Sequence, residues 1–113
     1  MMNKMIAIPV SNGQLDAHFG HCKEFAIFQI TDNKVSDELL IGAPPHEPGL
    51  LPRFLASKGI TDVIAGGMGN KAIQLFKQAG VNVFVGAPQI AANELIDGFL
   101  NQTIEFNANY CDH

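Results

Sequence analysis

The second half of the sequence alternates short apolar runs with amphipathic segments, and glycine marks the changes. Residues 61–65 (TDVIA) form an apolar run, and residues 70–79 follow with apolar side chains at helical spacing. Residues 81–85 form another apolar run, and residues 88–100 again have helical spacing. Strands that alternate with helices in this way are parallel and are joined by right-handed crossovers. The sequence therefore predicts an α/β protein.

The first half has a different pattern, which predicts antiparallel pairing. Residues 4–10 (KMIAIPV) and residues 24–30 (EFAIFQI) are apolar runs that we interpret as buried strands. Residues 31–34 (TDNK) are four polar residues of the kind found in turns, and a third strand is expected near residues 35–41. The strands at residues 24–30 and 35–41 are predicted to form a hairpin.

The predicted elements fit one compact topology. Residues 42–49 (GAPPHEPG) contain three prolines and are expected to be irregular, and residues 50–58 predict a helix. Counting strands along the chain, we expect a five-stranded mixed sheet in the order 3-2-1-4-5, with strand 2 antiparallel to the others and helices on both faces. The 113 residues suffice for a single domain, with residues 101–113 as a polar tail.

Charge and hydropathy exclude several classes of protein. The formal net charge is -4, with seven basic and eleven acidic residues, so nucleic acid is not an expected partner. No apolar run is long enough for a membrane span or a secretion signal, and we expect a cytoplasmic protein. In that compartment the thiols of Cys22 and Cys111 are expected to be reduced.

Soft metal ligands are concentrated in the loop of residues 11–23, which includes the stretch DAHFGHC. His18, His21 and Cys22 offer two imidazoles and a thiol, which suit zinc, copper or iron. The alternatives are solvated loop histidines and a small buried cysteine. At the other end of the chain Cys111 and His113 offer a second pair, unless that terminus is frayed.

A glycine-rich turn is expected to face this loop. In open α/β sheets ligands bind outside the carboxyl ends of the strands, where residues 11–23, 66–69 and 86–88 are predicted to meet. Glycines in such a turn permit positive φ angles and close approach of the backbone, and the following helix favours an anion at its N-terminus. The anion-binding set predicted here consists of Gly66, Gly67, Gly69 and Lys71. The alternative is that the glycines only form a tight turn.

Met68 and His46 are two further candidates for this arrangement. Met68 offers a soft thioether ligand, although core packing or the wall of a ligand cavity is the role expected of this methionine. His46 lies in the proline-rich segment and is expected either in a lid over the site or as a solvated loop histidine.

Enzymatic activity is not expected. A nuclease needs clustered carboxylates that hold Mg²⁺ on central strands, and residues 4–10 contain no acid. Ser11 has no evident base and orienting partner that would make it a nucleophile.

Three stretches together resemble the dinitrogenase iron–molybdenum cofactor-binding family. They are IAIPVSNG, DAHFGHCKEF, and PPHEPGLLPRFLASKGITDVIAGGMGNKAIQLFKQAGVNVFVGAP, and they cover nearly the whole chain in order. The resemblance implies a ribonuclease H-like fold. It also implies binding of a preformed, anionic metal–sulfur cluster that is held for transfer, since some relatives carry iron–sulfur–molybdenum precursors and another holds a molybdenum–copper sulfide cluster.

The resemblance gives the residues a common role. It implies an iron–sulfur or iron–molybdenum–sulfur cluster as cargo, delivered in metallocofactor assembly for nitrogen fixation, with assembly proteins or an iron–sulfur carrier ATPase as partners. The protein itself would be a monomer or weak oligomer. The expected cluster-binding residues are His18, Gly20, His21, Cys22, His46, Gly66, Gly67, Met68, Gly69 and Lys71. The alternative is a single zinc or copper ion held by His18, His21, Cys22, Cys111 and His113.

Overall fold

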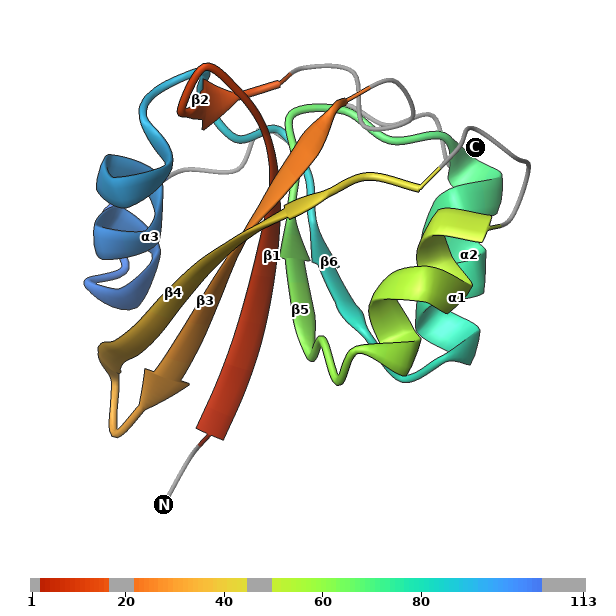
Figure 1. Ribbon diagram of the computed structural model, residues 1–113, viewed down its shortest axis with the longest axis horizontal. Coiled ribbons are helices and arrows are strands. Elements are labelled where there is room, and N and C mark those ends of the chain that lie inside the picture. The colour runs from red at the N-terminus through yellow and green to blue at the C-terminus, as the bar shows by residue number, and fades with distance from the viewer. Residues whose placement is uncertain (1–2, 17–21, 45–49, 105–113) are drawn as a thin grey trace.

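The fold is a mixed sheet with helices on both of its faces (Figure 1). The computed structural model describes residues 3–16, 22–44 and 50–104. The strands are β1 (Asn3–Ser11), β2 (Gln14–Leu15), β3 (Glu24–Thr31), β4 (Lys34–Gly42), β5 (Asp62–Ile64) and β6 (Asn82–Phe84). The helices are α1 (Leu50–Ser57), α2 (Asn70–Gln78) and α3 (Ala92–Leu100). The predicted α/β class is confirmed, whereas the ribonuclease H-like classification stays a prediction.

The predicted number of five strands is wrong, and counted along the chain the order is therefore 4-3-1-5-6 in place of the predicted 3-2-1-4-5, although the five predicted strands have the neighbours that were predicted. The sheet has six strands in the order β4-β3-β1-β5-β6, with β2 paired to β1 outside this path. The additional strand, β2, lies inside the segment that was predicted to be a loop. As predicted, β3 runs antiparallel to both of its neighbours, β1 and β4. The strands β1, β5 and β6 run parallel to one another.

Two tight turns explain the hairpins. Asn12 and Gly13 have φ angles of 54° and 82°, and they join β1 to β2 so that Ser11 pairs with Gln14. Asp32 and Asn33 have φ angles of 53° and 65° and join β3 to β4. Two successive residues with positive φ are typical of type I′ turns, whose twist matches that of the paired strands. Asn-Gly is the strongest sequence signal for such a turn, so β2 was predictable.

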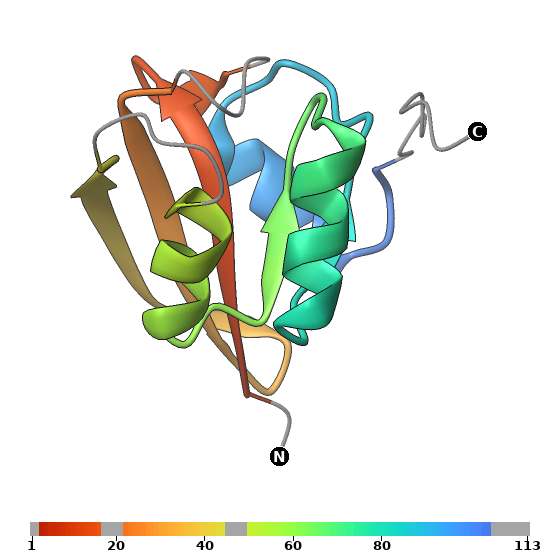
Figure 2. The same cartoon turned by 90° about the vertical axis from the view of Figure 1, so that its right-hand side faces the viewer.

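Each face of the sheet has its own hydrophobic core. The helices α1 and α2 cover one face and α3 covers the other, as the two views show (Figures 1 and 2). Successive side chains of β1 point to opposite faces: Ile6 and Ile8 pack on the side of α3, and Ala7 packs on the side of α1 and α2. The predicted covering of both faces is confirmed. Among the described residues, no helix combines the length and the apolar composition that crossing a bilayer requires.

The helix α3 begins four residues later than the predicted start at Pro88. The segment before it pairs with the new strand instead: Leu15 N–H donates to the Ile90 carbonyl at 3.0 Å, and Ala92 N–H donates to the Gly13 carbonyl at 3.0 Å. These contacts hold Ala91 in an extended conformation opposite Gln14, directly before the first residue of the helix. The helical spacing of residues 88–100 is a local pattern. It could not show that the first of these residues form backbone hydrogen bonds with a segment some 75 residues away in the sequence.

The helix α3 ends in a Schellman motif. Thr103 N–H donates to the Gly98 carbonyl at 2.8 Å, and Gln102 has a φ angle of 60° at the position that usually holds glycine. A Cβ added at Gly98 would lie 2.5 Å from Ile104 Cγ1. The first residues of the predicted polar tail therefore pack against the helix, while residues 105–113 lie outside the described residues.

A buried carboxylate joins three strands at the edge of the sheet where β5 and β6 begin. Asp62 is 1% exposed. Its two oxygens accept hydrogen bonds from Thr61 Oγ1 at 2.8 Å and from Asn82 Nδ2 at 2.9 Å. Met5 N–H on β1 donates to the same Thr61 hydroxyl oxygen at 2.9 Å. This network therefore links β1, β5 and β6.

We expect the substitution Asp62→Ala to destabilise the protein by about 1–3 kcal/mol, because it removes the acceptor of the hydrogen bonds from Thr61 and Asn82 and leaves space at a fully buried position. Urea unfolding followed by circular dichroism measures the effect. The control is Asp97→Ala on the exposed side of α3, which should change the free energy of unfolding by less than about 0.5 kcal/mol. Equal unfolding midpoints for the two variants would contradict the structural role of Asp62.

Candidate functional site

The carboxyl ends of β1, β5 and β6 lie at one edge of the sheet, at the top of Figure 1. The segments that follow these strands lead into β2, α2 and α3. This is the edge at which open α/β sheets bind ligands, because the loops that leave parallel strands converge there. The strand β3 begins at the same edge, since Glu24 pairs with Val10 near the end of β1. Cys22 is two residues before this strand start.

Backbone hydrogen bonds fasten these segments to one another. Gly86 N–H donates to the Gly66 carbonyl at 3.0 Å, and Ala87 N–H donates to the Ala65 carbonyl at 3.2 Å. The turn before α2 is thereby tied to the segment before α3. Gly86 has a φ angle of 87°, which a residue with a side chain rarely adopts. In this region Gly86 is therefore a residue whose backbone conformation requires glycine.

The predicted glycine turn has a different conformation from the one expected. Gly66, Gly67 and Gly69 are not among the glycines with positive φ, and Gly69 has a φ angle of -67°. Apart from the neighbouring residues of the chain, no atom of the described residues lies within 4 Å of the position that a Cβ would occupy at Gly69. Neither backbone strain nor crowding within the protein therefore explains the glycine at residue 69, whose missing side chain leaves the backbone open to an approaching group.

The helix that begins at this turn presents a positive end. Gly69 is the N-cap of α2, no described side chain caps it, and the first turn contains no acidic residue. The first N–H groups of an α-helix have no partner within the helix, and they favour an anion. Lys71, in the first turn, is exposed and adds a full positive charge. The N-terminus of α2 can therefore accept an anionic ligand.

Cys22 and Met68 are soft side chains buried in the same core. Cys22 is 8% exposed and Met68 is 9% exposed, and both belong to the cluster on the side of α1 and α2. Burial and, to a smaller extent, the charge of Asp16 raise the pKa of the Cys22 thiol, and a backbone hydrogen bond lowers it, so that the pKa is about 11. At neutral pH Cys22 is a protonated thiol, so its use as a metal ligand requires loss of a proton.

Asp16 is a residue that the sequence analysis did not assign to the site. It lies in the same DAHFGHC stretch as Cys22, and its charge acts on the thiol. Its N–H donates to the Pro9 carbonyl at 2.9 Å, which extends the pairing of β1 and β2. Six predicted site residues lie outside the described residues, and their roles stay predictions: His18, Gly20, His21, His46, Cys111 and His113.

Among the described residues the structure contains no group of three or more His, Cys, Asp or Glu side chains arranged to hold a metal ion. The described residues bring the turn of residues 66–69 and Lys71 together with the buried Cys22 and Met68. The segment that carries Gly86 lies beside this turn.

The model of the dinitrogenase iron-molybdenum cofactor family matches residues 2–102, which is nearly the whole chain. The chain belongs to the dinitrogenase iron-molybdenum cofactor family. The protein MJ0580 of Methanocaldococcus jannaschii is 31% identical over 105 residues, which cover 88% of each chain.

Solved structures share the fold of this family member. The crystal structure of PH0822 matches with a TM-score of 0.86 at 25% identity, over 93% of this chain and 96% of that chain. The apo form of the orange protein from Desulfovibrio gigas matches with a TM-score of 0.76 at 21% identity, over 93% of both chains. The sequence-based identification of the family is thereby confirmed.

We expect Cys22 to react slowly with thiol reagents in the folded protein. The substitution Cys111→Ser leaves Cys22 as the only cysteine, so 5,5′-dithiobis(2-nitrobenzoate) reports on it alone. With a pKa of about 11 in place of 9.0, the thiolate fraction at pH 8 falls about 100-fold, and the rate should fall by at least that factor relative to the same variant in urea. Similar rates for folded and unfolded protein would show that the thiol is neither buried nor protonated.

Proposed function

We propose that this protein binds an anionic iron–sulfur or iron–molybdenum–sulfur cluster, or a precursor of one, and carries it for metallocofactor assembly. The observation that carries the proposal is the uncapped N-terminus of α2, with Lys71 in its first turn and open space at Gly69. It lies at the edge where the loops after parallel strands converge. Membership of the family supports a role connected with the iron–molybdenum cofactor.

The chemistry of the turn fits such a cargo. Sulfide-rich clusters are anionic, and several backbone N–H groups directed at one point form an anion-binding concavity. Lys71 contributes a charge that attracts any anionic cluster without selecting its metal. In this proposal His18 and His21 supply one or two bonds to metal, with Cys22 as a further ligand once it has lost its proton.

The proposal describes a carrier and not an enzyme. A carrier must release its cargo, so a sparse set of ligands with electrostatic support serves it better than a closed cage of four protein ligands, which is typical of structural metal sites. Proteins of metallocofactor assembly, including an iron–sulfur carrier ATPase, are the proposed partners. The proposed setting is nitrogen fixation in the cytoplasm, with the protein as a monomer or weak oligomer.

Anaerobic purification followed by metal and sulfide analysis tests this function. We expect iron or molybdenum together with acid-labile sulfide, and a visible charge-transfer spectrum. Metal-free protein should give a saturable visible change when titrated with tetrathiomolybdate or with a synthetic iron–sulfur cluster. A colourless protein with one zinc ion and no response to either cluster would overturn cluster carriage and identify the single-ion site.

We expect Lys71→Gln to weaken binding of tetrathiomolybdate at least threefold at low ionic strength, because it removes the positive charge beside the N-terminus of α2. The difference should shrink as salt is added, since salt screens exposed charges. The matched control is Lys77→Gln, an exposed lysine in the last turn of the same helix, which should leave the Kd within the error of the titration. Equal losses for the two variants would indicate a general charge effect and no site at this turn.

A further inference from the structure

The strand β4 forms a free edge of the sheet. Within the part of the chain that the structure describes, it pairs only with β3. Three of its large apolar side chains are exposed: Val35 by 43%, Leu39 by 58% and Leu40 by 57%. An edge strand presents unpaired N–H and C=O groups that can pair with another chain, and proteins usually protect such edges.

Only the first half of β4 is protected. Between Gln29 and Ile30 the register with β3 shifts, and Ser36 Oγ donates to the Gln29 carbonyl at 3.1 Å. Next to this irregularity, Asp37 Oδ1 accepts the N–H of Glu38 at 2.9 Å. A bulge and a carboxylate that occupies a backbone donor are both devices that discourage strand addition.

The second half of β4 lacks these devices. Ala43 N–H donates to the Lys23 carbonyl at 2.8 Å, so this pair is a hydrogen-bonded pair of the antiparallel ladder. Because such pairs alternate along a ladder, the backbone groups of Leu40 and Gly42 point away from β3. The side chains along this half are Leu39, Leu40 and Ile41. An incoming strand would therefore find open backbone groups beside apolar side chains.

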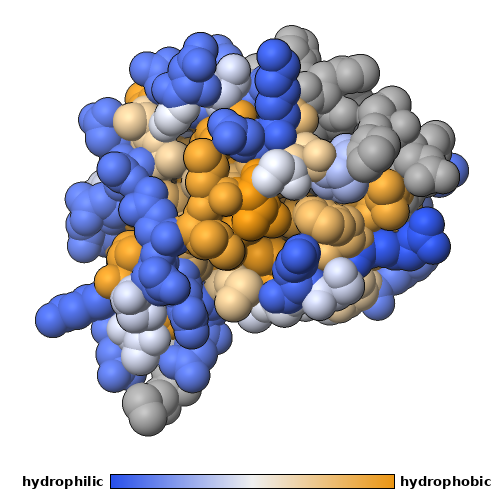
Figure 3. All heavy atoms as spheres, viewed as in Figure 1, coloured by the Kyte–Doolittle hydropathy of each residue, from blue (hydrophilic) through white to orange (hydrophobic). Residues whose placement is uncertain are grey.

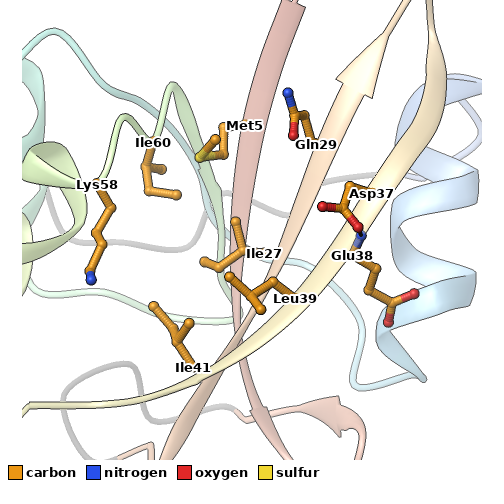
Figure 4. A pocket seen from close by; sticks show the side chains of 9 residues that line it. All are labelled: Met5, Ile27, Gln29, Asp37, Glu38, Leu39, Ile41, Lys58 and Ile60. Atoms are coloured by element: carbon orange, nitrogen blue, oxygen red, sulfur yellow. Dashed lines mark hydrogen bonds between the residues drawn. The ribbon is translucent and has the colours of Figure 1, made fainter.

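An apolar hollow of about 190 Å³ lies directly beside this open half. It is lined from β4 by Leu39 and Ile41, from the neighbouring strands by Met5 and Ile27, and from the segment after α1 by Ile60. In Figure 4 these side chains surround a common space, and Figure 3 shows the apolar surface they form on this face of the molecule. The hollow has room for an apolar side chain of an added strand.

The charges around the hollow identify the chemistry of its occupant. Asp37 and Glu38 lie at its rim, and neither forms an ion pair with a described residue. Lys58 also lines the hollow, and its Nζ lies 5.2 Å from the centre of the Phe54 ring. The two unpaired carboxylates favour a basic partner. A second copy of this chain is disfavoured because each copy has a net charge of -4.

We propose that the open half of β4 accepts an extended segment of a partner protein in which apolar residues alternate with lysine or arginine. The added strand pairs with the backbone of Leu40 and Gly42 and places an apolar side chain in the hollow. Because successive side chains of a strand point to opposite faces, its basic residues lie on the other face of the sheet, which is the face of Glu38. Strand addition to a sheet edge is a recurring mode of peptide recognition, with affinity from the backbone and selectivity from the pockets. This surface is separate from the N-terminus of α2, so the proposal does not depend on the cargo.

Titration of the isotope-labelled full chain with two synthetic peptides tests this. One peptide is Thr-Val-Lys-Val-Lys-Val-Thr and the other is Thr-Val-Glu-Val-Glu-Val-Thr, both with blocked ends. We expect the lysine peptide to cause saturable shifts in the amide NMR signals of Leu40 and Gly42, with a Kd at least tenfold lower than that of the glutamate peptide.

Two variants of β4 make the test specific. Leu39→Asn should raise the Kd of the lysine peptide at least tenfold, because it removes an apolar wall of the hollow. The matched control is Val35→Asn, an exposed apolar residue of the protected half, which should leave the Kd within twofold. Equal affinity for both peptides, or shifts confined to other parts of the protein, would overturn the proposal. Concentration-dependent dimerisation through β4 would also overturn it and identify a second copy as the occupant.

Discussion

The pairing of β1 on both of its edges is the constraint on which the rest of the structure depends. It is antiparallel to β3 from the Asn3–Thr31 pair to the Val10–Glu24 pair, and parallel to β5 on its other edge. Its side chains alternate between the two cores, and a slip of one residue would exchange the two faces. The same register places the end of β1 beside the end of β5, and hence the turn that follows β1 on the same edge as the glycine turn that follows β5.

Local patterns in the sequence were sufficient for most of the elements but not for the contacts between distant segments. Runs of apolar residues bounded by glycine and proline gave the α/β class and the antiparallel β3, because these signals are local. The strand β2 and the late start of α3 depend on one another, through the bonds that join Gly13 and Leu15 to residues 90–92. Periodicity within either segment carries no information on that pairing, although Asn12-Gly13 was a usable signal for the turn.

In the candidate site, too, the features that depend on local sequence were predictable and those that depend on distant contacts were not. The turn of residues 66–69 and Lys71 were identified from the sequence, because glycine before a helix is recognisable from residue type alone. The protonated state of Cys22 depends on its burial and on the charge of Asp16, and neither follows from spacing. Gly69 forgoes the side-chain hydrogen bond that Ser, Thr, Asp or Asn would make as the N-cap of α2, which costs only about a few tenths of a kcal/mol because glycine is itself a favoured N-cap residue. The burial of Ile73 and Phe76 stabilises the helix instead, which leaves its N-terminal donors available.

The burial of Cys22 also bears on resistance to oxidants. Peroxides oxidise the thiolate much faster than the thiol, and the first product is a sulfenic acid. With a pKa of about 11, Cys22 contains almost no thiolate at neutral pH, and its sulfur is shielded by the core around Phe25 and Met68. The protein therefore retains a reduced sulfur at residue 22 during exposure to peroxide, and this sulfur stays available to the metal–sulfur cluster that we propose as the cargo.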